Sequence, residues 1–345
     1  MNYSKNDTMI AKGFAAILLL IHHLFYTTDY AFSSFLFSRE GWVNLAKISK
    51  VCVAMFLILS GYGLAKSFEK HQLSSFSFVK RHLLKVYTGF WMIFALSLIP
   101  LCFAYKGKTF GSTWGGGIQF IEDFLGIRLW FGEYGYNPTW WFLSLIIPLY
   151  ILFPLLYKSV QKKPVELLLA SFFIFLLGGI FKYSFCWLLK TWSFPFVLEI
   201  FSAKYDLFDR IKKSSYPGMK TCLFILLIGL CALRLRELKL LDADAMLIFD
   251  GLTAFVFIAA SYVFINAETK IARVGAFIGK NSMNIFLMHT FVFFTYFQKF
   301  SYSLKYPPLI LLQLLLICLA FSVILEKTKE MCLQILKRGK KNLSP

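Results

Sequence analysis

The sequence predicts an all-α polytopic membrane protein with about ten transmembrane helices and both termini in the cytoplasm. Three observations predict this class. The chain of 345 residues is 58% hydrophobic and only 16% charged, which is too apolar for a soluble core of this size. Its apolar residues fall into long runs, each near the roughly 20 residues that cross a bilayer. Its Lys and Arg residues lie mostly between those runs.

Ten apolar runs define the predicted spans. The sixth is interrupted by Lys190 and Pro195, but proline is tolerated in a membrane helix when neighbouring groups satisfy the freed backbone. No repeat of fixed period is visible, so residues 1–345 are predicted to form one integral membrane domain, with a basic cytoplasmic tail at 327–345. The predicted spans are 9–28, 48–66, 84–105, 140–157, 165–182, 185–202, 220–236, 245–266, 279–298 and 307–326.

The formal net charge of +19 is explained by membrane topology. A basic chain also suits nucleic acid, but here the cations lie in short segments between apolar runs, so the predicted partner is a lipid bilayer and no nucleic acid. An inward amino terminus places most Lys and Arg on the cytoplasmic side of a multi-pass protein of the inner or plasma membrane. Segment 106–139, rich in Gly, Trp and Tyr, then faces outward, either as an interfacial loop or as the lining of an entrance.

The cysteine spacing argues against a metal site or disulfide framework, and the first span argues against a removable signal peptide. None of the seven cysteines lies in C-x-x-C spacing, so neither a metal site nor a disulfide framework is predicted. The first span has no small-residue cleavage site after it and is followed by further spans. We therefore expect a retained helix rather than a removable signal peptide.

His23 is the first candidate for chemistry. Lys12 precedes it by eleven residues, which on an α-helix returns the side chain to within about 20° and climbs roughly 16 Å. His23 therefore lies deep in the first span, where ionisable side chains are costly and mark functional sites. A neutral imidazole there is suited to take a proton from a hydroxyl. The alternatives are a structural histidine bonded between helices and, for Lys12, a side chain that snorkels to the membrane edge.

His289 lies at a similar depth in the ninth predicted span, about ten residues or roughly 15 Å from its inner end. Ser282 and Asn284 on the same span supply polar partners. Serine and asparagine also join membrane helices without further role. The packing and functional interpretations of His289 both stay open.

Four basic or potentially basic side chains, Lys80, Arg81, His82 and Lys85, lie within six residues on the predicted cytoplasmic loop after the second span. Positive-inside topology and attraction to anionic lipid explain part of this patch. The same side chains also suit a phosphorylated donor such as coenzyme A, because Arg and Lys bind phosphate strongly.

Two further positions carry polar or aromatic groups near span ends. Ser60, followed by Gly61, is a possible hydrogen-bond donor in the second span, although small residues in membrane helices also serve packing. Trp141 opens the fourth span and fits an outer aromatic belt.

Taken in order, these segments resemble the acyltransferase 3 family of integral membrane enzymes, and the resemblance covers nearly the whole chain. The first helix of that family typically carries Arg, ten residues and His, a spacing that Lys12 and His23 match. Ser60-Gly61-Tyr62 resembles its Phe-x-x-Ser-Gly-Phe element, and Phe78 to Tyr87 resembles its basic Arg-x-x-Arg element.

Two later segments extend the resemblance. Trp141-Phe142-Leu143 is similar to the fourth-helix aromatic signature, and Gly279 to His289 is similar to the Gly-x-x-Ser-x-x-x-Tyr-Leu-x-His segment. The chain departs from the family where Lys12 replaces Arg and where His82 and Lys85 replace paired arginines, so charge survives without bidentate geometry. Ile146 and Ile147 stand where subfamilies with an appended hydrolase-like domain have Glu, so a stand-alone form is expected.

The resemblance implies transfer of an acyl group, acetyl foremost, from cytoplasmic acetyl-CoA or another acyl-CoA to a hydroxyl of a sugar or cell-surface glycan, without a metal. It implies catalysis by His23, as general base or as acyl-carrying nucleophile, aided by Lys12. The basic patch would bind CoA, with support from Ser60, Trp141, Ser282 and His289. A permease or proton-coupled transporter is the main alternative, since membrane histidines also mark transport paths. A polymerase or ligase acting on lipid-linked sugar is a third.

Overall fold

The helices follow the predicted apolar runs, with differences at their ends that decide where the polar side chains lie. The computed structural model describes residues 3–27, 29–30, 32–71, 73–176, 184–216, 218–237 and 247–341. In these ranges the regular structure is helical, apart from one isolated bridge between Phe35 and Phe37. The predictions for 177–182, 245–246 and the end of the basic tail at 342–345 lie outside the described residues.

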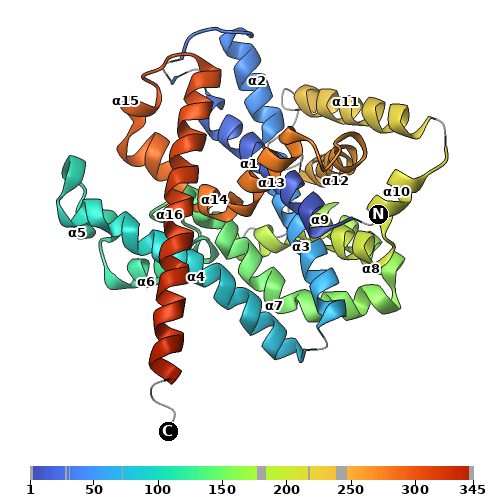
Figure 1. The fold of residues 1–345 in the computed structure, drawn as a ribbon, viewed down its shortest axis with the longest axis horizontal. Helices are drawn as coiled ribbons and strands as arrows, with labels where there is room; N and C mark the ends of the chain where they lie inside the picture. The colour runs from blue at the N-terminus through green and yellow to red at the C-terminus, as the bar shows by residue number, and fades with distance from the viewer. Residues whose placement is uncertain are drawn as a thin grey trace.

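Figure 1 names the helices in chain order. The longer ones are α1 (Lys5–Phe25), α3 (Cys52–Lys70), α4 (Ser75–Cys102), α7 (Trp141–Lys162), α9 (Ser184–Lys204), α11 (Met219–Glu237), α12 (Leu247–Phe264) and α16 (Pro307–Lys341). The shorter ones are α2 (Arg39–Ser49), α5 (Phe110–Trp114), α6 (Gly117–Leu125), α8 (Pro164–Leu176), α10 (Leu207–Lys213), α13 (Lys270–Lys280), α14 (Ser282–Thr290) and α15 (Gln298–Ser301). Three 3-10 turns are η1 (Tyr105–Gly107), η2 (Arg128–Phe131) and η3 (Pro138–Trp140), and η4 (Phe291–Tyr296) is a π-helical segment.

Five helical stretches of the described chain are long and apolar enough to cross a membrane. They coincide with the first, second, third, fourth and tenth predicted spans. The remaining predicted spans correspond to α8, α9, α11, α12 and the pair α13 and α14, which are helical but shorter or less apolar. The described part of the chain is therefore all-helical in its regular elements, and several of its helices are long and apolar enough to span a membrane. The five stretches are Lys5–Phe25, Arg39–Lys70, Ser75–Cys102, Pro138–Lys162 and Pro307–Met331.

The ninth predicted span, 279–298, is helical from Ser282 to Tyr296, and its first two residues form the end of the preceding helix α13. Helix α13 ends at Lys280, and after a turn at Asn281 the chain continues as α14 and then as η4. The cause is polar: the Asn281 side chain donates to the carbonyl of Phe277 at 2.8 Å and accepts from the Ser322 hydroxyl at 2.8 Å. This break lets α14 take a direction of its own.

Helix α4 extends beyond the third predicted span at its amino end. Helix α4 begins at Ser75, nine residues before the predicted position, because the Ser74 side chain accepts from the backbone N–H of Ser77 and caps the first turn. The basic residues 80–85 therefore lie on a helix rather than on a loop.

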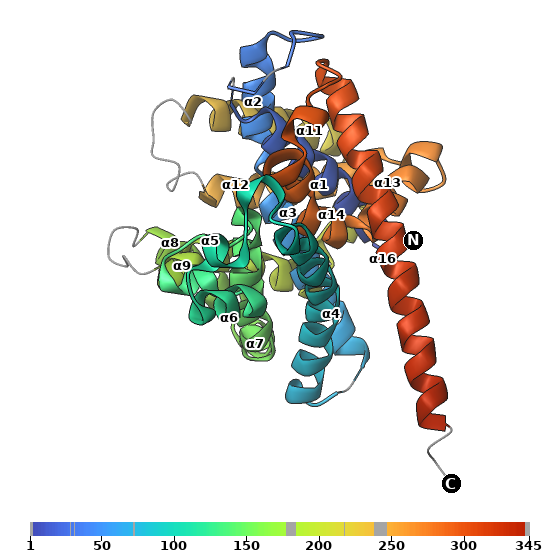
Figure 2. The same cartoon turned by 90° about the vertical axis from the view of Figure 1, so that its left-hand side faces the viewer.

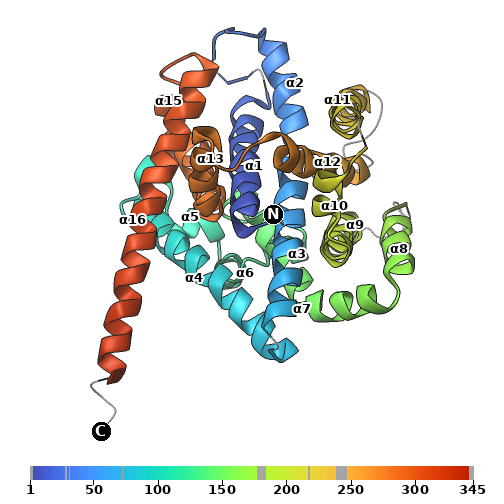
Figure 3. The ribbon, with the colours of Figure 1, turned by 45° about the vertical axis from the view of Figure 1, so that its right-hand side comes forward.

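Helix α1 lies in the middle of the molecule, between α13 on one side and α2 and α3 on the other (Figure 3). Its contact with α13 is unusually close. A methyl group at Gly13 would lie 2.0 Å from the carbonyl oxygen of Gly275, and one at Gly279 would lie 1.8 Å from that of Met9. Gly275 and Gly279 are four residues apart, the small-residue spacing that lets membrane helices approach backbone to backbone.

Replacement of Gly13 by alanine should therefore lower the stability by about 3 kcal/mol, because the added methyl group overlaps backbone atoms that cannot rotate away. The matched control is Gly63→Ala on α3, where nothing lies within 4 Å of the new methyl group. That helical position should gain about 0.5–1 kcal/mol from helix propensity. Thermal unfolding in detergent measures both, and equal midpoints for the two variants would contradict the close crossing.

Helix α16 runs along one side of the molecule and projects beyond the other helices at its carboxyl end (Figure 2). Polar side chains join it to α14 inside the molecule. Asn284 donates to the Ser322 hydroxyl at 2.9 Å and to the Glu326 carboxylate at 3.1 Å. These bonds fix α14 between α16 and α1.

The segment between α4 and α7 folds back on the helices around Asp123. The Asp123 carboxylate accepts from the Trp114 indole at 2.7 Å and from the Tyr136 backbone N–H at 2.9 Å. Burial raises the pKa of this carboxyl, and these hydrogen bonds and the nearby Arg128 only partly offset the effect. The Tyr136 hydroxyl lies 2.7 Å from that of Tyr296 in η4, so this segment packs over the end of the α14–η4 unit.

Candidate active site

The two candidate histidines meet. The ring centroids of His23 on α1 and His289 on α14 are 4.9 Å apart, with ring planes tilted by 47°. Phe293 stacks on His289 at 5.9 Å and lies 6.3 Å from His23, so it closes one side of the pair. His289 is fully buried, whereas His23 is partly exposed. The His23 ring thus packs against a ring of another helix, and His23 is the less buried residue of the pair.

Hydrogen bonds fix the tautomer of His289. Its Nδ1 lies 2.8 Å from the carbonyl oxygen of Phe286 and 3.1 Å from that of Ile285. A carbonyl oxygen only accepts, so Nδ1 carries the hydrogen and Nε2 carries the lone pair. The Thr290 hydroxyl oxygen lies 3.4 Å from Nε2.

His22, next to the pair, has a different role. Its Nδ1 donates to the carbonyl of Ala46 at 2.8 Å, which joins α1 to α2. Its ring lies edge-on to His23 at 4.9 Å. We interpret His22 as a structural histidine between helices.

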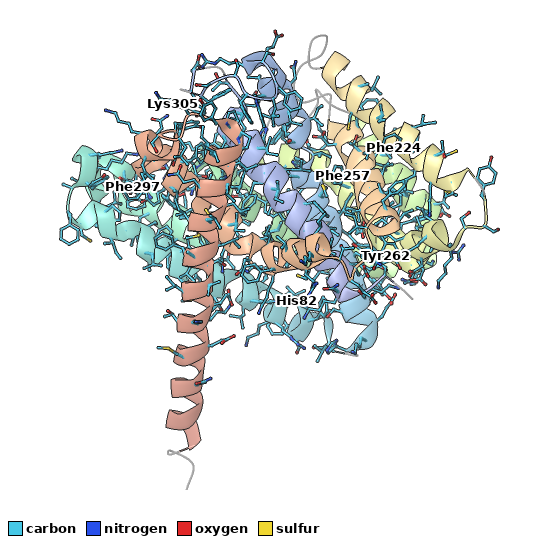
Figure 4. The ribbon with its side chains drawn as sticks, turned by 45° about the horizontal axis from the view of Figure 1, so that its top comes forward. His82, Phe224, Phe257, Tyr262, Phe297 and Lys305 are labelled. Atoms are coloured by element: carbon cyan, nitrogen blue, oxygen red, sulfur yellow. The ribbon has the colours of Figure 1, made fainter. Side chains whose placement is uncertain are left out.

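The predicted basic patch forms a shallow groove on α4 of about 480 Å³. Three of the four predicted residues, Lys80, Arg81 and Lys85, line it. His82, labelled in Figure 4, does not: its Nδ1 donates to the Phe78 carbonyl at 2.8 Å and its ring lies 4.1 Å from that of Phe78. The complete lining is Ser77, Lys80, Arg81, Leu84, Lys85 and Thr88.

Lys12 connects this groove with the helix that carries His23. It is partly exposed on α1, and its ammonium group lies within electrostatic range of Lys85 on α4. On the same helix, His23 is eleven residues or roughly 16 Å further along. The groove, Lys12 and His23 thus follow one another toward the far end of α1.

The supporting residues predicted from the sequence lie in other parts of the molecule. The Ser60 hydroxyl lies 2.5 Å from that of Tyr150, so it joins α3 to α7. Trp141 packs on Trp192 of α9 with ring centroids 5.8 Å apart. Ser282 is the buried first residue of α14. The structure brings only His289 of this group into contact with His23.

Sequence reasoning missed a polar chain beside His289. The Thr290 hydroxyl lies 3.1 Å from that of Thr139, which donates to the Asn137 side-chain oxygen at 2.7 Å. In the same turn, the Trp140 indole donates to the Leu287 carbonyl at 3.0 Å. The available signals were the Asn137-Pro138 turn dipeptide and the threonine that directly follows His289.

Glu199 on α9 is the second group that sequence reasoning missed. It is fully buried, and neither carboxylate oxygen has a hydrogen-bond partner within the part of the chain that the structure describes. Gly61 makes room for it, since a methyl group there would lie 3.2 Å from the Glu199 Cβ. Asp209 contrasts with it, because that buried carboxylate accepts from the Tyr3 backbone N–H at 2.7 Å and from the Tyr262 hydroxyl at 3.0 Å.

These two carboxylates give a paired stability prediction. Glu199→Leu should leave the unfolding midpoint unchanged or raise it, because removing a buried polar group without partners removes a desolvation cost. Asp209→Leu should lower the stability by about 3 kcal/mol, since it breaks two hydrogen bonds to a carboxylate. Thermal unfolding in detergent compares them, and equal losses would mean that Glu199 has a partner of its own.

The chain is similar in sequence to known proteins. Residues 9–327 match the model of a protein family described as an acyltransferase domain. Among curated proteins, the acyltransferase MdmB of Streptomyces mycarofaciens is 30% identical over 129 residues, which cover 36% of this chain and 32% of that protein. The match thus spans about a third of the relative's length. No solved structure gives a significant match to the chain.

Proposed function

This chain belongs to the acyltransferase family whose domain it matches over residues 9–327, and on that premise we propose that it is a membrane O-acyltransferase. It transfers an acyl group, acetyl foremost, from cytoplasmic acyl-CoA to a hydroxyl group of a sugar or cell-surface glycan. The proposed location is the inner or plasma membrane, with both chain termini in the cytoplasm.

The observation that carries this proposal is the contact between His23 and His289 inside the helices. Acyl transfer to a hydroxyl needs a base that removes the hydroxyl proton, and a neutral imidazole is the usual base. His23 supports this role because it is less buried than His289 and its ring packs against other rings inside the helices. His289 is fully buried and cannot meet a substrate without movement.

The basic groove supports the choice of donor. Lys80, Arg81 and Lys85 present three cations around one groove on α4, and charge-assisted hydrogen bonds bind phosphate groups strongly. Acyl-CoA carries its phosphates at one end and its thioester at the other. We place the phosphates in the groove and direct the thioester along α1 toward His23.

In the proposed reaction, the acceptor O–H gives its proton to His23 while its oxygen attacks the thioester carbonyl carbon. The C–S bond breaks, and His23 returns the proton to the departing CoA thiolate, so that the products are an ester and CoASH. An acyl-His23 intermediate is the alternative route, with the same ring nitrogen as nucleophile. Lys12 lies roughly 16 Å from His23 along α1. We therefore assign Lys12 to donor binding together with Lys85.

The test uses membranes that contain the protein, labelled acetyl-CoA and extraction of glycans after incubation. We expect label in the glycan fraction and release of free CoA thiol. Movement of a solute across the membrane without consumption of acyl-CoA would overturn the proposal in favour of a transporter.

A further inference from the structure

The hydrogen-bond chain next to His289 determines where the protons lie. The side-chain oxygen of Asn137 is identified by the backbone N–H of Thr139, which donates to it at 3.0 Å. The Thr139 hydroxyl also donates to this oxygen, at 2.7 Å, and so uses its only hydrogen there. In the bond of 3.1 Å between Thr139 and Thr290, Thr290 must then be the donor.

Because of this assignment, Thr290 does not donate a hydrogen bond to the lone pair on Nε2 of His289. Thr290 has a single hydroxyl hydrogen and gives it to Thr139, so it cannot also donate to His289 Nε2, which lies 3.4 Å away. Nδ1 carries its hydrogen toward the carbonyls of Phe286 and Ile285. A buried imidazole nitrogen thus keeps a free lone pair. Of the rings that contact His289 in the described structure, that of His23 lies nearest.

We propose that His289 is a positioning residue for the acyltransferase reaction, and that its Nε2 accepts the ring N–H of His23. The other ring nitrogen of His23 then carries the lone pair that takes the proton of the acceptor hydroxyl. This inference rests on the proposed function for its consequence, and the hydrogen bond itself is inferred from the 4.9 Å contact of the two rings and the free lone pair of His289 Nε2.

His23 and His289 have the roles of the histidine and the carboxylate of a catalytic triad, but His289 is neutral where the triad has a charged carboxylate. The accepting group holds the tautomer of the base and stabilises the imidazolium that forms when the base is protonated. A neutral imidazole suits an interior of membrane helices, where a permanent carboxylate charge is costly to bury. His23 holds the proton of the acceptor hydroxyl until it passes to the CoA thiolate. His289 therefore neither gains nor loses a proton overall.

Kinetics of two His289 variants test the role. In His289→Leu, which removes the acceptor, kcat should fall by about 100-fold while KM for acetyl-CoA stays unchanged. His289→Gln places an amide oxygen near the position of Nε2 and should recover at least about tenfold of that loss, because an acceptor for the His23 N–H is restored. Full kcat in His289→Leu, or equal losses in both variants, would overturn the proposal.

Variants of Thr139 and Thr290 give a second test, which distinguishes the proposed positioning role of His289 from a merely structural one. Thr139→Val removes the acceptor of the Thr290 hydrogen, so that Thr290 donates to His289 Nε2 instead and competes with His23. We expect kcat to fall by about tenfold. Adding Thr290→Val removes the competing donor and should restore kcat. The matched control is Thr253→Val on α12, a buried threonine outside this chain of bonds, whose kcat should stay at the wild-type value. A double variant no better than Thr139→Val would overturn the assignment.

Nitrogen NMR separates failure of this inference from failure of the proposed function. The sequence holds only five histidines, so 15N-histidine labelling with single substitutions assigns each ring. We expect one protonated and one unprotonated nitrogen for His23 in the wild type and in His289→Gln, and a mixture of tautomers in His289→Leu. If the wild type transfers no acyl group, the proposed function fails, and this spectrum still decides the hydrogen bond. An unchanged His23 spectrum in His289→Leu would overturn it.

Discussion

Replacement of His23 by alanine is expected to abolish acyl transfer, with a loss in kcat of about 10³-fold or more. The reason is that the imidazole of His23 supplies the base or the nucleophile in either proposed route, and removal of such a group costs about 10²–10⁴-fold. Its buried neighbour cannot replace it, since His289 is fully covered. The measurement is incorporation of labelled acetyl from acetyl-CoA into extracted glycans, normalised to the amount of inserted protein.

The adjacent histidine provides the control. His22 lies one position earlier on α1 and donates to the Ala46 carbonyl, so His22→Ala should lower the unfolding midpoint slightly and retain acyl transfer. A purely structural role for both histidines predicts similar losses in both variants. Full activity of His23→Ala would remove the proposed catalyst.

Helical periodicity predicted much of this site. The eleven-residue spacing of Lys12 and His23 placed both on one side of α1, and the depth of His289 in its span matched that of His23. Their contact could not be predicted, because it depends on two features outside any one helix. One is the break at Asn281, which redirects α14, and the other is the crossing of α1 and α13 at Gly13 and Gly275.

The polar chain beside His289 shows a different limit. Thr139 and Asn137 belong to an irregular segment more than 140 residues before Thr290, and nothing in their local sequence indicates their partner. Glu199 was missed for the opposite reason. It lies inside an apolar run where a single carboxyl group does not alter the prediction of a helix, and only packing against Gly61 reveals its burial.

The basic patch illustrates how a boundary error changes a site. Because α4 starts at Ser75, its periodicity applies to residues 80–85, which a loop would leave unordered. At about 100° per residue, Arg81 and Lys85 lie within roughly 40° of each other, whereas His82 lies roughly 100° from Arg81. Lys80 is equally far from Arg81 on the other side and still lines the groove, so what sets His82 apart is its position four residues after Phe78, where it donates to the Phe78 carbonyl and packs on that ring.

From this geometry we expect that the double variant Arg81→Ala and Lys85→Ala raises KM for acetyl-CoA by about 100-fold with a smaller change in kcat. Each charge-assisted hydrogen bond to a phosphate contributes about 1.5–3 kcal/mol, and the groove offers Lys80 as the only remaining cation among its described lining residues. Initial rates over a range of acetyl-CoA concentrations measure the change. The single variant Lys70→Ala, an exposed lysine at the end of α3 outside the groove, serves as control and should keep the wild-type KM.

A truncated donor tests whether the groove binds phosphate rather than the thioester. Acetyl-pantetheine lacks the nucleotide and its phosphates, so the wild type and the double variant should use it equally well, both with a high KM. The effects on KM of removing the phosphates and of removing the two cations would then be non-additive, as expected when both changes delete the same interaction. If the double variant lost activity equally with both donors, the groove would serve folding or lipid contact, and acyl-CoA would have to bind elsewhere. In an Arg81→Cys variant, we expect the introduced cysteine to be labelled only from the cytoplasmic side, because the proposed donor, cytoplasmic acyl-CoA, would reach the groove from there.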